Sequence, residues 1–389
     1  MSGVGDSRGG GFVSIYRLLF LSLGHMTSDL YPGMLSPLLP LLLPRYGLSM
    51  AKAGVLVMVL QVFCNFSQPV AGIINDHIPM KVFLWLGIII SAIPFCFILQ
   101  FQRLDMMMIA LAVSGIGVGM FHPVGAVAAS LTSSGNRGGI SMAVFSSGGT
   151  VGFMIAPLII VGIVEILGEQ FMPLVLLPAL FTTAYFMFNR TIVVSSNYDL
   201  SLKEWFSALL VSKRELFIVW LVSVFRAVVQ VLISSFLPLL AIARGLSYAK
   251  SAYFLSASLL AGMCGMFVGG YLSDMHGRRK ILAITQLAAS PLLYVFLFTE
   301  GMVSTLFLLL GMAFLSASIP INIILAQRAA PKNTGVASSM VMGLSFGIGA
   351  LAAPPFGILA DHIGIEAAMK VISIIPVLGG ISVFLLRKE

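Results

Sequence analysis

The chain has 389 residues, of which 59% are hydrophobic and only 9% are charged, and its mean hydropathy is +1.04. A soluble domain usually carries about 25% charged residues, so water could not solvate a surface this poor in charge. These figures exclude a soluble enzyme and a nucleic-acid-binding protein. The net charge of +8 is therefore first examined as a signal of membrane topology.

Twelve apolar segments predict twelve membrane-spanning helices, because one span needs roughly 20 residues. They are expected at 12–43, 51–75, 80–101, 104–131, 138–166, 169–190, 215–243, 249–274, 279–300, 302–326, 334–360 and 366–386. No cleavage site of the A-x-A type follows the first segment, so we expect that segment to be kept as a helix. The fold class is therefore an all-α polytopic membrane protein.

The longest polar interruption, 191–214, predicts a short amphipathic helix on the inner membrane surface, because leucine and aromatic residues alternate there with Ser, Lys and Glu. It separates an N-terminal bundle, 1–190, from a C-terminal bundle, 215–389, each with six spans. With the N-terminus inside, 15 of the 22 basic residues lie on the cytoplasmic side and six outside, while Arg226 lies within a span. This bias predicts that both termini are cytoplasmic.

The two halves match one another at a constant shift of 198 residues, which indicates an internal duplication. The shift aligns Pro40 with Pro238, Gly47-Leu48-Ser49 with Gly245-Leu246-Ser247, Gly72 with Gly270, Asp76 with Asp274, Gly149 with Gly347, and Pro157 with Pro355. Parallel six-helix repeats are typical of transporters that bind their substrate between the repeats.

A polar motif follows the eighth span and, in a weaker copy, the second. The second-half copy contains Gly270, Asp274, Gly277, Arg278 and Arg279, and the first-half copy contains Gly72, Asp76 and Lys81. The motif resembles the signature of the major facilitator superfamily, although Met275 replaces the usual basic residue. An Asp at a helix end can pair with a cation or a helix N-terminus in one transport state and release it in the other. The alternative is that the basic cluster only anchors the topology.

Two helices carry a closer resemblance. The runs Leu23-Gly24-His25-Met26-Thr27-Ser28-Asp29 and Val118-Gly119-Met120-Phe121-His122-Pro123, with Gln68-Pro69 and Gly72, resemble the fosmidomycin-resistance subgroup of this superfamily, which are bacterial drug exporters. The chain departs from the subgroup at Val124 and Val127, where a Glu and a basic residue are usual. The role of that Glu is therefore not carried over. The resemblance implies a location in the bacterial inner membrane and a cavity lined by helices one, four, seven and ten.

Ionisable side chains within a span cost roughly 2.5 to 3.5 kcal/mol and mark functional candidates. Asp29 lies near the middle of the first span, with His25 one turn earlier on the same face. Asp29 with His25 or His122 is a candidate proton-coupling site, because burial disfavours the charged carboxylate and a histidine can share its proton. Arg226 suits an anionic substrate group, and the resemblance implies that it faces Asp29. The alternatives are a structural Asp29–Arg226 ion pair and a His122 that satisfies a backbone carbonyl next to Pro123.

Further candidates for the cavity wall are polar or aromatic. They are Tyr31, Asn65, Gln68, Phe121, Phe225, Gln230 and Asn322, and each polar one has the alternative of an interhelical hydrogen bond. The fifth span carries Gly148, Gly149, Gly152 and Pro157. This pattern loosely resembles the antiporter motif of drug exporters, but close helix packing is the favoured explanation. Cys64, Cys96 and Cys264 lie in apolar runs without metal-ligand spacing.

We therefore expect a secondary transporter that works by alternating access and exports a small amphipathic or anionic compound by proton exchange. The alternatives are an importer or facilitator of an organic anion or nutrient, and a non-transporting receptor. No Ser/His/Asp order, zinc motif or nucleotide-binding loop indicates an enzyme. The expected partners are a small-molecule substrate, protons and the lipid bilayer, without nucleic acid. We expect a monomer without cofactor or metal.

Overall fold

The computed structural model describes residues 7–74, 80–132, 138–189, 214–331 and 333–387. The predicted amphipathic helix lies outside these residues apart from Arg214, and so does Asp76. The described residues contain helices and turns but no strand. The predicted all-α class is therefore confirmed.

The first six predicted spans correspond to helices with similar bounds, except that the third is shorter than expected. They are α1 (Ser7–Tyr46), α2 (Met50–Ile74), α3 (Met80–Cys96), α4 (Leu104–Ser130), α5 (Gly138–Val161) with its π-helical extension η2 (Gly162–Leu167), and α6 (Leu176–Phe188) with the preceding 3-10 turn η3 (Glu169–Val175). Pro94 lies in the last turn of α3. Its missing N–H weakens the helix there, which agrees with an end at Cys96 rather than at residue 101.

The second six spans are partly divided into shorter helices. They are α8 (Arg214–Ala243), α9 (Tyr248–His276), α10 (Arg278–Phe296) and α11 (Gly301–Ala329), followed by α12 (Thr334–Ser339), η4 (Met340–Leu344), α13 (Ser345–Leu351) and α14 (Ala353–Ile363), and by α15 (Ile365–Ile372) and α16 (Ile375–Val383). The break before α14 precedes Pro354 and Pro355, which cannot donate backbone hydrogen bonds. In the described part of the chain, nine helical stretches are long and apolar enough to cross a membrane.

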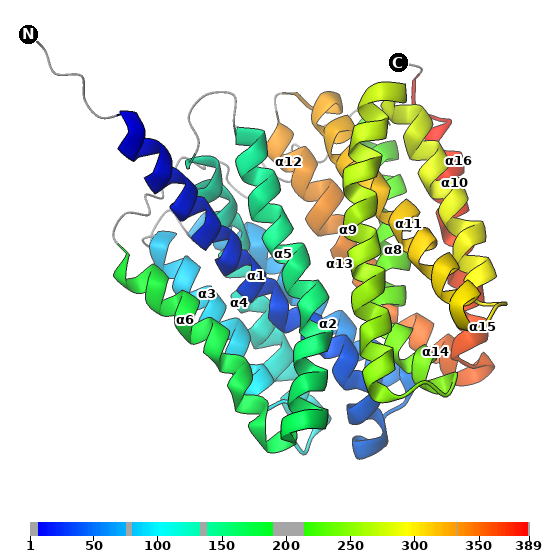
Figure 1. The fold of residues 1–389 in the computed structure, drawn as a ribbon. Helices are drawn as coiled ribbons and strands as arrows, with labels where there is room; N and C mark the ends of the chain where they lie inside the picture. Colours follow the sequence, from blue (N-terminus) through cyan, green and yellow to red (C-terminus); the bar gives the residue numbers. More distant parts are fainter. Residues whose placement is uncertain (1–6, 75–79, 133–137, 190–213, 332, 388–389) are drawn as a thin grey trace, which may run out of the picture.

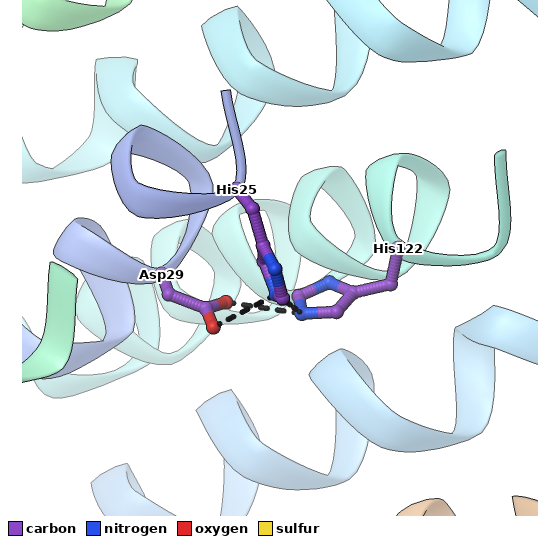
Figure 2. Close-up of side chains that lie close together, drawn as sticks. All are labelled: His25, Asp29 and His122. Carbon is purple, nitrogen blue, oxygen red and sulfur yellow. Dashed lines mark hydrogen bonds and ion pairs between the residues drawn. The ribbon is translucent and has the colours of Figure 1, made fainter. Parts of the chain in front are cut away.

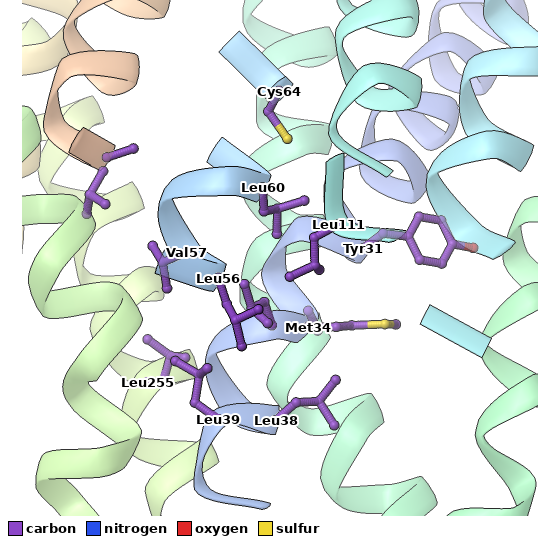
Figure 3. Close-up of a cluster of buried hydrophobic side chains, with 14 of the residues drawn as sticks. Tyr31, Met34, Leu38, Leu39, Leu56, Val57, Leu60, Cys64, Leu111 and Leu255 are labelled. Atoms are coloured by element: carbon purple, nitrogen blue, oxygen red, sulfur yellow. The ribbon is translucent and has the colours of Figure 1, made fainter. Parts of the chain in front are cut away.

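The helices form two groups, with α1–α6 on one side of Figure 1 and α8–α16 on the other. Helix α1 begins, and α16 ends, at the same face of the molecule, which we call the terminal face. The side on which α2 begins and α14 ends is called the opposite face. An apolar cluster joins the two groups, because Leu255 of α9 lies beside Leu39 of α1 and Val57 of α2 (Figure 3).

Each half has an arginine that ties three helix ends together at the opposite face. Arg45 pairs with Glu169 at 2.5 Å and donates to the carbonyl of Leu99 at 3.3 Å. In the second half, Arg244 pairs with Glu366 at 2.8 Å and donates to the carbonyl of Leu297 at 3.0 Å. We call these two sets the arginine clasps. They lie at equivalent places of the duplicated chain.

Removal of Arg244 is expected to destabilise the chain more than removal of Glu366. The Arg244 guanidinium also donates to the Phe296 carbonyl at 3.3 Å and lies over the Phe296 ring at 5.1 Å. Arg244→Ala takes the donor from the Leu297 carbonyl, at about 1–3 kcal/mol. Glu366→Ala removes only partly exposed ion pairs, with Arg244 and with Lys370, each worth about 0–1 kcal/mol. Thermal unfolding in detergent measures both. Equal losses for the two variants would show that only the ion pair matters.

The two halves approach most closely at the opposite face. A Cβ atom added to Gly54 of α2 would lie 2.8 Å from the Cα of Pro354, and one added to Gly357 of α14 would lie 2.6 Å from the Cα of Ala51. Asp361 of α14 accepts hydrogen bonds from the backbone N–H groups of Met50 at 2.8 Å and Ala51 at 3.0 Å. These N–H groups begin α2, where a carboxylate is favoured by the unpaired donors and the helix dipole. The halves are therefore in close backbone contact at this face.

Candidate functional site

Three ionisable side chains from α1 and α4 converge inside the first half (Figure 2). The Nε2 atom of His25 lies 3.2 Å from Oδ2 of Asp29, and the Nε2 atom of His122 lies 3.1 Å from Oδ1. The two Nε2 atoms are themselves 3.2 Å apart. His25 and Asp29 are buried, and His122 is partly exposed. We call this cluster the triad. The expected proximity of Asp29 to both histidines is therefore present.

The outer nitrogens of the triad fix where the hydrogens lie. Nδ1 of His25 is 2.7 Å from the carbonyl oxygen of Phe145, and Nδ1 of His122 is 2.9 Å from that of Val118. A carbonyl can only accept, so both Nδ1 atoms must carry a hydrogen. In the neutral rings both Nε2 atoms then hold lone pairs, which face each other and the Asp29 carboxylate. Three acceptors this close require a shared proton or another cation between them.

The contact between His122 and Val118 bears on the alternative that His122 satisfies the backbone carbonyl left free by Pro123. Pro123 has no N–H group, so the carbonyl that it leaves without a helical partner is that of Gly119, four residues earlier. His122 bonds to the carbonyl of Val118 instead. The side chain therefore does not fill the place opened by the proline.

The glycine-rich face of α5 is what allows the triad to fit. A Cβ atom on Gly149 would lie 2.6 Å from Nε2 of His25 and would also collide with the carboxylate of Asp29. Gly148 and Gly152 lie against the backbone of α1 at Ser22 and Met26 in the same way. The same glycines therefore allow α5 to pack closely on α1 and leave room for the side chains of His25 and Asp29.

Arg226 of α8 is buried, and its side-chain contacts lie within the second half. Its Nη1 atom donates to Gln230 at 2.5 Å, and its guanidinium lies 4.7 Å from the ring centre of Phe346. Its Nε atom has no hydrogen-bond partner, and among the described residues no carboxylate forms an ion pair with it. The alternative of a structural Asp29–Arg226 ion pair is therefore absent from this conformation of the described residues. A buried cation without an anion is costly, so Arg226 suits an anionic ligand.

Several of the other candidates are engaged in local hydrogen bonds. Tyr31 donates to the carbonyl of Val175 at 3.0 Å and so ties α1 to η3. Asn65 and Gln68 donate to carbonyls one turn earlier in α2, those of Gln61 at 2.7 Å and Cys64 at 3.1 Å. These bonds lie within α2 or join α1 to the sixth span, so they give these side chains a structural role in this state.

Of the remaining candidates, Phe121 lies beside the triad and Gln230 contacts Arg226. Phe121 is fully buried, and its ring centre lies 6.2 Å from that of His25, so it supports the triad. Gln230 holds Arg226. Phe225 lies against Gly379 of α16. Asn322 of α11 is fully buried, and both polar atoms of its amide lack partners. An unpaired buried amide is costly, which makes Asn322 the strongest of the polar cavity candidates.

The motif after α9 forms a local structure. Asp274 pairs with Arg278 at 2.5 Å, and Arg279 donates to the carbonyl of Phe384 at 2.8 Å. Gly277 has a φ of 91°, a left-handed conformation that favours glycine. Gly269, rather than the neighbouring Gly270 of the motif, approaches α11 closely: a Cβ on Gly269 would lie 2.6 Å from that of Ala317, whereas one on Gly270 would lie 3.7 Å from Pro320.

In the first half, only part of the motif can be placed. Lys81 donates to the carbonyl of Met187 at 3.1 Å, which joins the start of α3 to the end of α6. Gly72 lies in α2, and Asp76 lies outside the described residues. The described part of this copy therefore packs within its own half.

Sequence reasoning missed the arginine clasps, the cap formed by Asp361, and the ring of Phe346 beneath Arg226. The clasps carry a signal in the repeat, but the two glutamates and two arginines match at shifts of 197 and 199 rather than 198. Each pair is therefore displaced by one residue from the constant shift. No sequence signal marks Phe346, because an apolar residue in a span is ordinary.

Comparisons with known proteins agree on one family. The family model described as Major Facilitator Superfamily matches residues 21–354. The chain is 25% identical to the fosmidomycin resistance protein of Escherichia coli (strain K12), over 94% of this chain and 91% of that protein. It is 26% identical to an uncharacterised MFS-type transporter of Bacillus subtilis (strain 168), over 96% and 93%.

Solved structures show the same fold. A bacterial homologue of the human lysosomal transporter Spinster, solved in an inward-facing, unoccupied conformation, has a TM-score of 0.81 at 15% identity and covers 98% of this chain and 97% of its own. The nucleoside transporter NupG has a TM-score of 0.74 at 13% identity, over 95% of this chain and 99% of its own. At these identities the likeness concerns the fold alone.

Proposed function

Because the chain belongs to the major facilitator superfamily of transporters, which are not enzymes, we propose that it exports a small amphipathic or anionic compound in exchange for protons. It spans the membrane many times, and its two halves would rock around the buried sites of α1, α4 and α8. The observation that carries this proposal is the triad, where two imidazole nitrogens lie 3.2 Å apart and each lies within 3.2 Å of an oxygen of the Asp29 carboxylate.

The triad supplies a place for the coupling proton. One proton shared among His25, Asp29 and His122 satisfies the facing lone pairs and balances the carboxylate charge. Loss of that proton would leave a net negative group in a buried site, which is unfavourable without a compensating cation. Proton entry and release would therefore bias the halves toward different openings. The site lies in the first half alone, since the shift of 198 aligns Asp29 with Ala227 and His122 with Pro320.

Arg226 supplies a place for the anionic part of the substrate. It is buried, and its Nε atom lacks a partner. Asn322 of α11 and Phe346 of α13 add an unpaired amide and an apolar ring in the same half. An anion bound at Arg226 would relieve the cost of the isolated charge, and the ring would favour a compound with an apolar part.

Replacement of Arg226 by methionine is expected to stabilise the protein while it weakens substrate binding. Removing an uncompensated buried charge stabilises by about 1–4 kcal/mol, whereas breaking a structural ion pair would destabilise. A thermal-shift screen of amphipathic anions, fosmidomycin included, identifies a ligand of the wild type and is repeated on the variant. Arg226→Lys, which keeps the charge, is the matched control. Lower stability together with an unchanged ligand shift would contradict the anion site.

We further propose that the terminal face is cytoplasmic and that the protein is a monomer of the bacterial inner membrane. The distribution of basic residues supports this orientation. In that orientation the contacts of Gly54, Gly357 and Asp361 close the outer side. The conformation is then inward-facing, as is that of the Spinster homologue.

The direction of transport is tested in everted membrane vesicles with an acidic interior. An exporter that exchanges protons should accumulate the screened ligand in these vesicles, and dissipation of the gradient should release it. Accumulation in intact cells instead would favour an importer of an organic anion, which the replacement of the usual Glu by Val124 keeps as the second candidate. The relative named for fosmidomycin resistance supports export. Vesicles without the protein are the control.

A further inference from the structure

The triad has a geometry that a proton alone does not require. The two Nε2 atoms are 3.2 Å apart, and each faces one oxygen of the Asp29 carboxylate: Nε2 of His25 lies 3.2 Å from Oδ2, and Nε2 of His122 lies 3.1 Å from Oδ1. Ligand atoms bound to one zinc ion at about 2.0–2.1 Å are about 3.3 Å apart at tetrahedral angles. At right angles, as in an octahedral site, the same bond lengths place the ligands about 2.9 Å apart. The three observed distances of 3.1–3.2 Å lie between these two values.

The outer contacts of the histidines have the form found around metal ligands. A histidine that binds a metal through one nitrogen usually donates its other N–H to a carboxylate or a backbone carbonyl, which fixes the ring. His25 donates from Nδ1 to Phe145, and His122 donates from Nδ1 to Val118. The ring of His25 also stacks on that of Phe145, with centres 4.3 Å apart. Both Nε2 lone pairs are thus held in the direction of the shared centre.

We propose that the triad binds one divalent transition-metal ion of the zinc class through Nε2 of His25, Nε2 of His122 and one oxygen of Asp29. Two imidazoles and one carboxylate favour such ions over magnesium or calcium, which prefer oxygen ligands. The ion would balance the buried carboxylate and replace the facing lone-pair contacts with bonds. Three protein ligands leave a fourth position for water or for an anionic group of the substrate.

An ion can reach the site through His122. His25 and Asp29 have 10% of their side-chain surface exposed, whereas His122 has 22% exposed. The expectation that the chain binds no metal rested on the cysteines and on contiguous motifs. The triad has no contiguous motif, because its ligands come from two helices that are far apart in the sequence. The metal site does not depend on the proposed transport function, since binding is measured without transport.

The test uses the full chain, purified in detergent without a histidine tag and stripped of metal. Zinc is titrated by calorimetry, and cobalt(II) is followed by the absorption bands of its tetrahedral complexes. We expect one ion per chain. His122→Ala should weaken binding by more than about 100-fold, since even partners of the ligands contribute 10–100-fold. His362→Ala, which removes an exposed histidine of α14, is the matched control and should bind as the wild type does.

Asp29→Asn provides a second variant if His122→Ala does not fold, and the melting temperatures of the metal-free variants show which of them are folded. Absence of zinc heat and of cobalt bands in the wild type at millimolar metal would overturn the proposal. Binding that is unchanged in both triad variants would overturn it as well. If metal binds at the triad but the vesicles show no proton-driven transport, the metal site stands and the proposed function fails.

Discussion

Asparagine in place of Asp29 is expected to lower proton-driven accumulation by roughly 5- to 150-fold, while the chain remains folded and still exchanges substrate. The amide keeps the shape of the carboxylate, and its NH2 group can donate to a histidine lone pair without a proton from solvent. The triad then no longer has to gain or lose a proton between states. Coupling free energies of about 1–3 kcal/mol correspond to changes of roughly 5- to 150-fold, and we expect accumulation in everted vesicles to fall by a factor in this range.

Substrate counterflow separates loss of coupling from loss of folding. This exchange of labelled for unlabelled substrate needs no net proton movement and should persist in Asp29→Asn. Asp105→Asn is the matched control, because Asp105 pairs with Arg103 at a surface of the molecule, where both side chains are about half exposed or more. Undiminished accumulation in Asp29→Asn would remove Asp29 from the mechanism.

Leucine in place of Gly54 is expected to hold the two halves apart at the opposite face and to stop transport. Its Cβ atom alone would lie 2.6 Å from the carbonyl carbon of Ala353 and 2.8 Å from the Cα of Pro354, so backbone rather than a flexible side chain has to move. Overpacking of this kind costs about 1–3 kcal/mol, which favours the open arrangement by roughly 5- to 150-fold. The hydrogen bonds from Met50 and Ala51 to Asp361 should be lost together with this contact.

Spin labels on Lys52 and His362, both exposed at this face, measure the separation of α2 and α14, once the exposed Cys264 has been replaced by serine. The distance distribution should move to longer values in Gly54→Leu. Gly162→Leu is the control, because a Cβ on Gly162 meets no atom within 4 Å. A distribution identical to that of the wild type would show that the helices accommodate the side chain without opening.

The composition of the chain and the lengths of its apolar segments were sufficient to predict an all-α membrane fold. Water cannot cover so apolar a chain, and the length of a span is set by the bilayer, so twelve helices follow from the segments alone. Helix ends were less predictable. The structure ends α3 at Cys96, beside Pro94, and divides the eleventh span before Pro354.

The candidate site was predictable only where its residues lie on one helix. The spacing of four between His25 and Asp29 places them on one face, and the structure has them 3.2 Å apart. The direction of Arg226 depends on how α8 packs against α13, where the ring of Phe346 lies, and neither spacing nor composition carries that information. The fit of Gly149 beside Asp29 likewise depends on the packing of α5 on α1.

The two buried polar sites belong to different copies of a duplicated unit, with the triad in one and Arg226 in the other. Neither site is repeated, since Ser28 and Ala227 stand at the matching positions. After the duplication, each copy was therefore free to specialise. With the proposed roles of the two sites, substitutions in α8 or α11 would change which compound is carried, while the coupling proton would still bind in α1 and α4. Related proteins could then differ in substrate specificity while they keep the same coupling site.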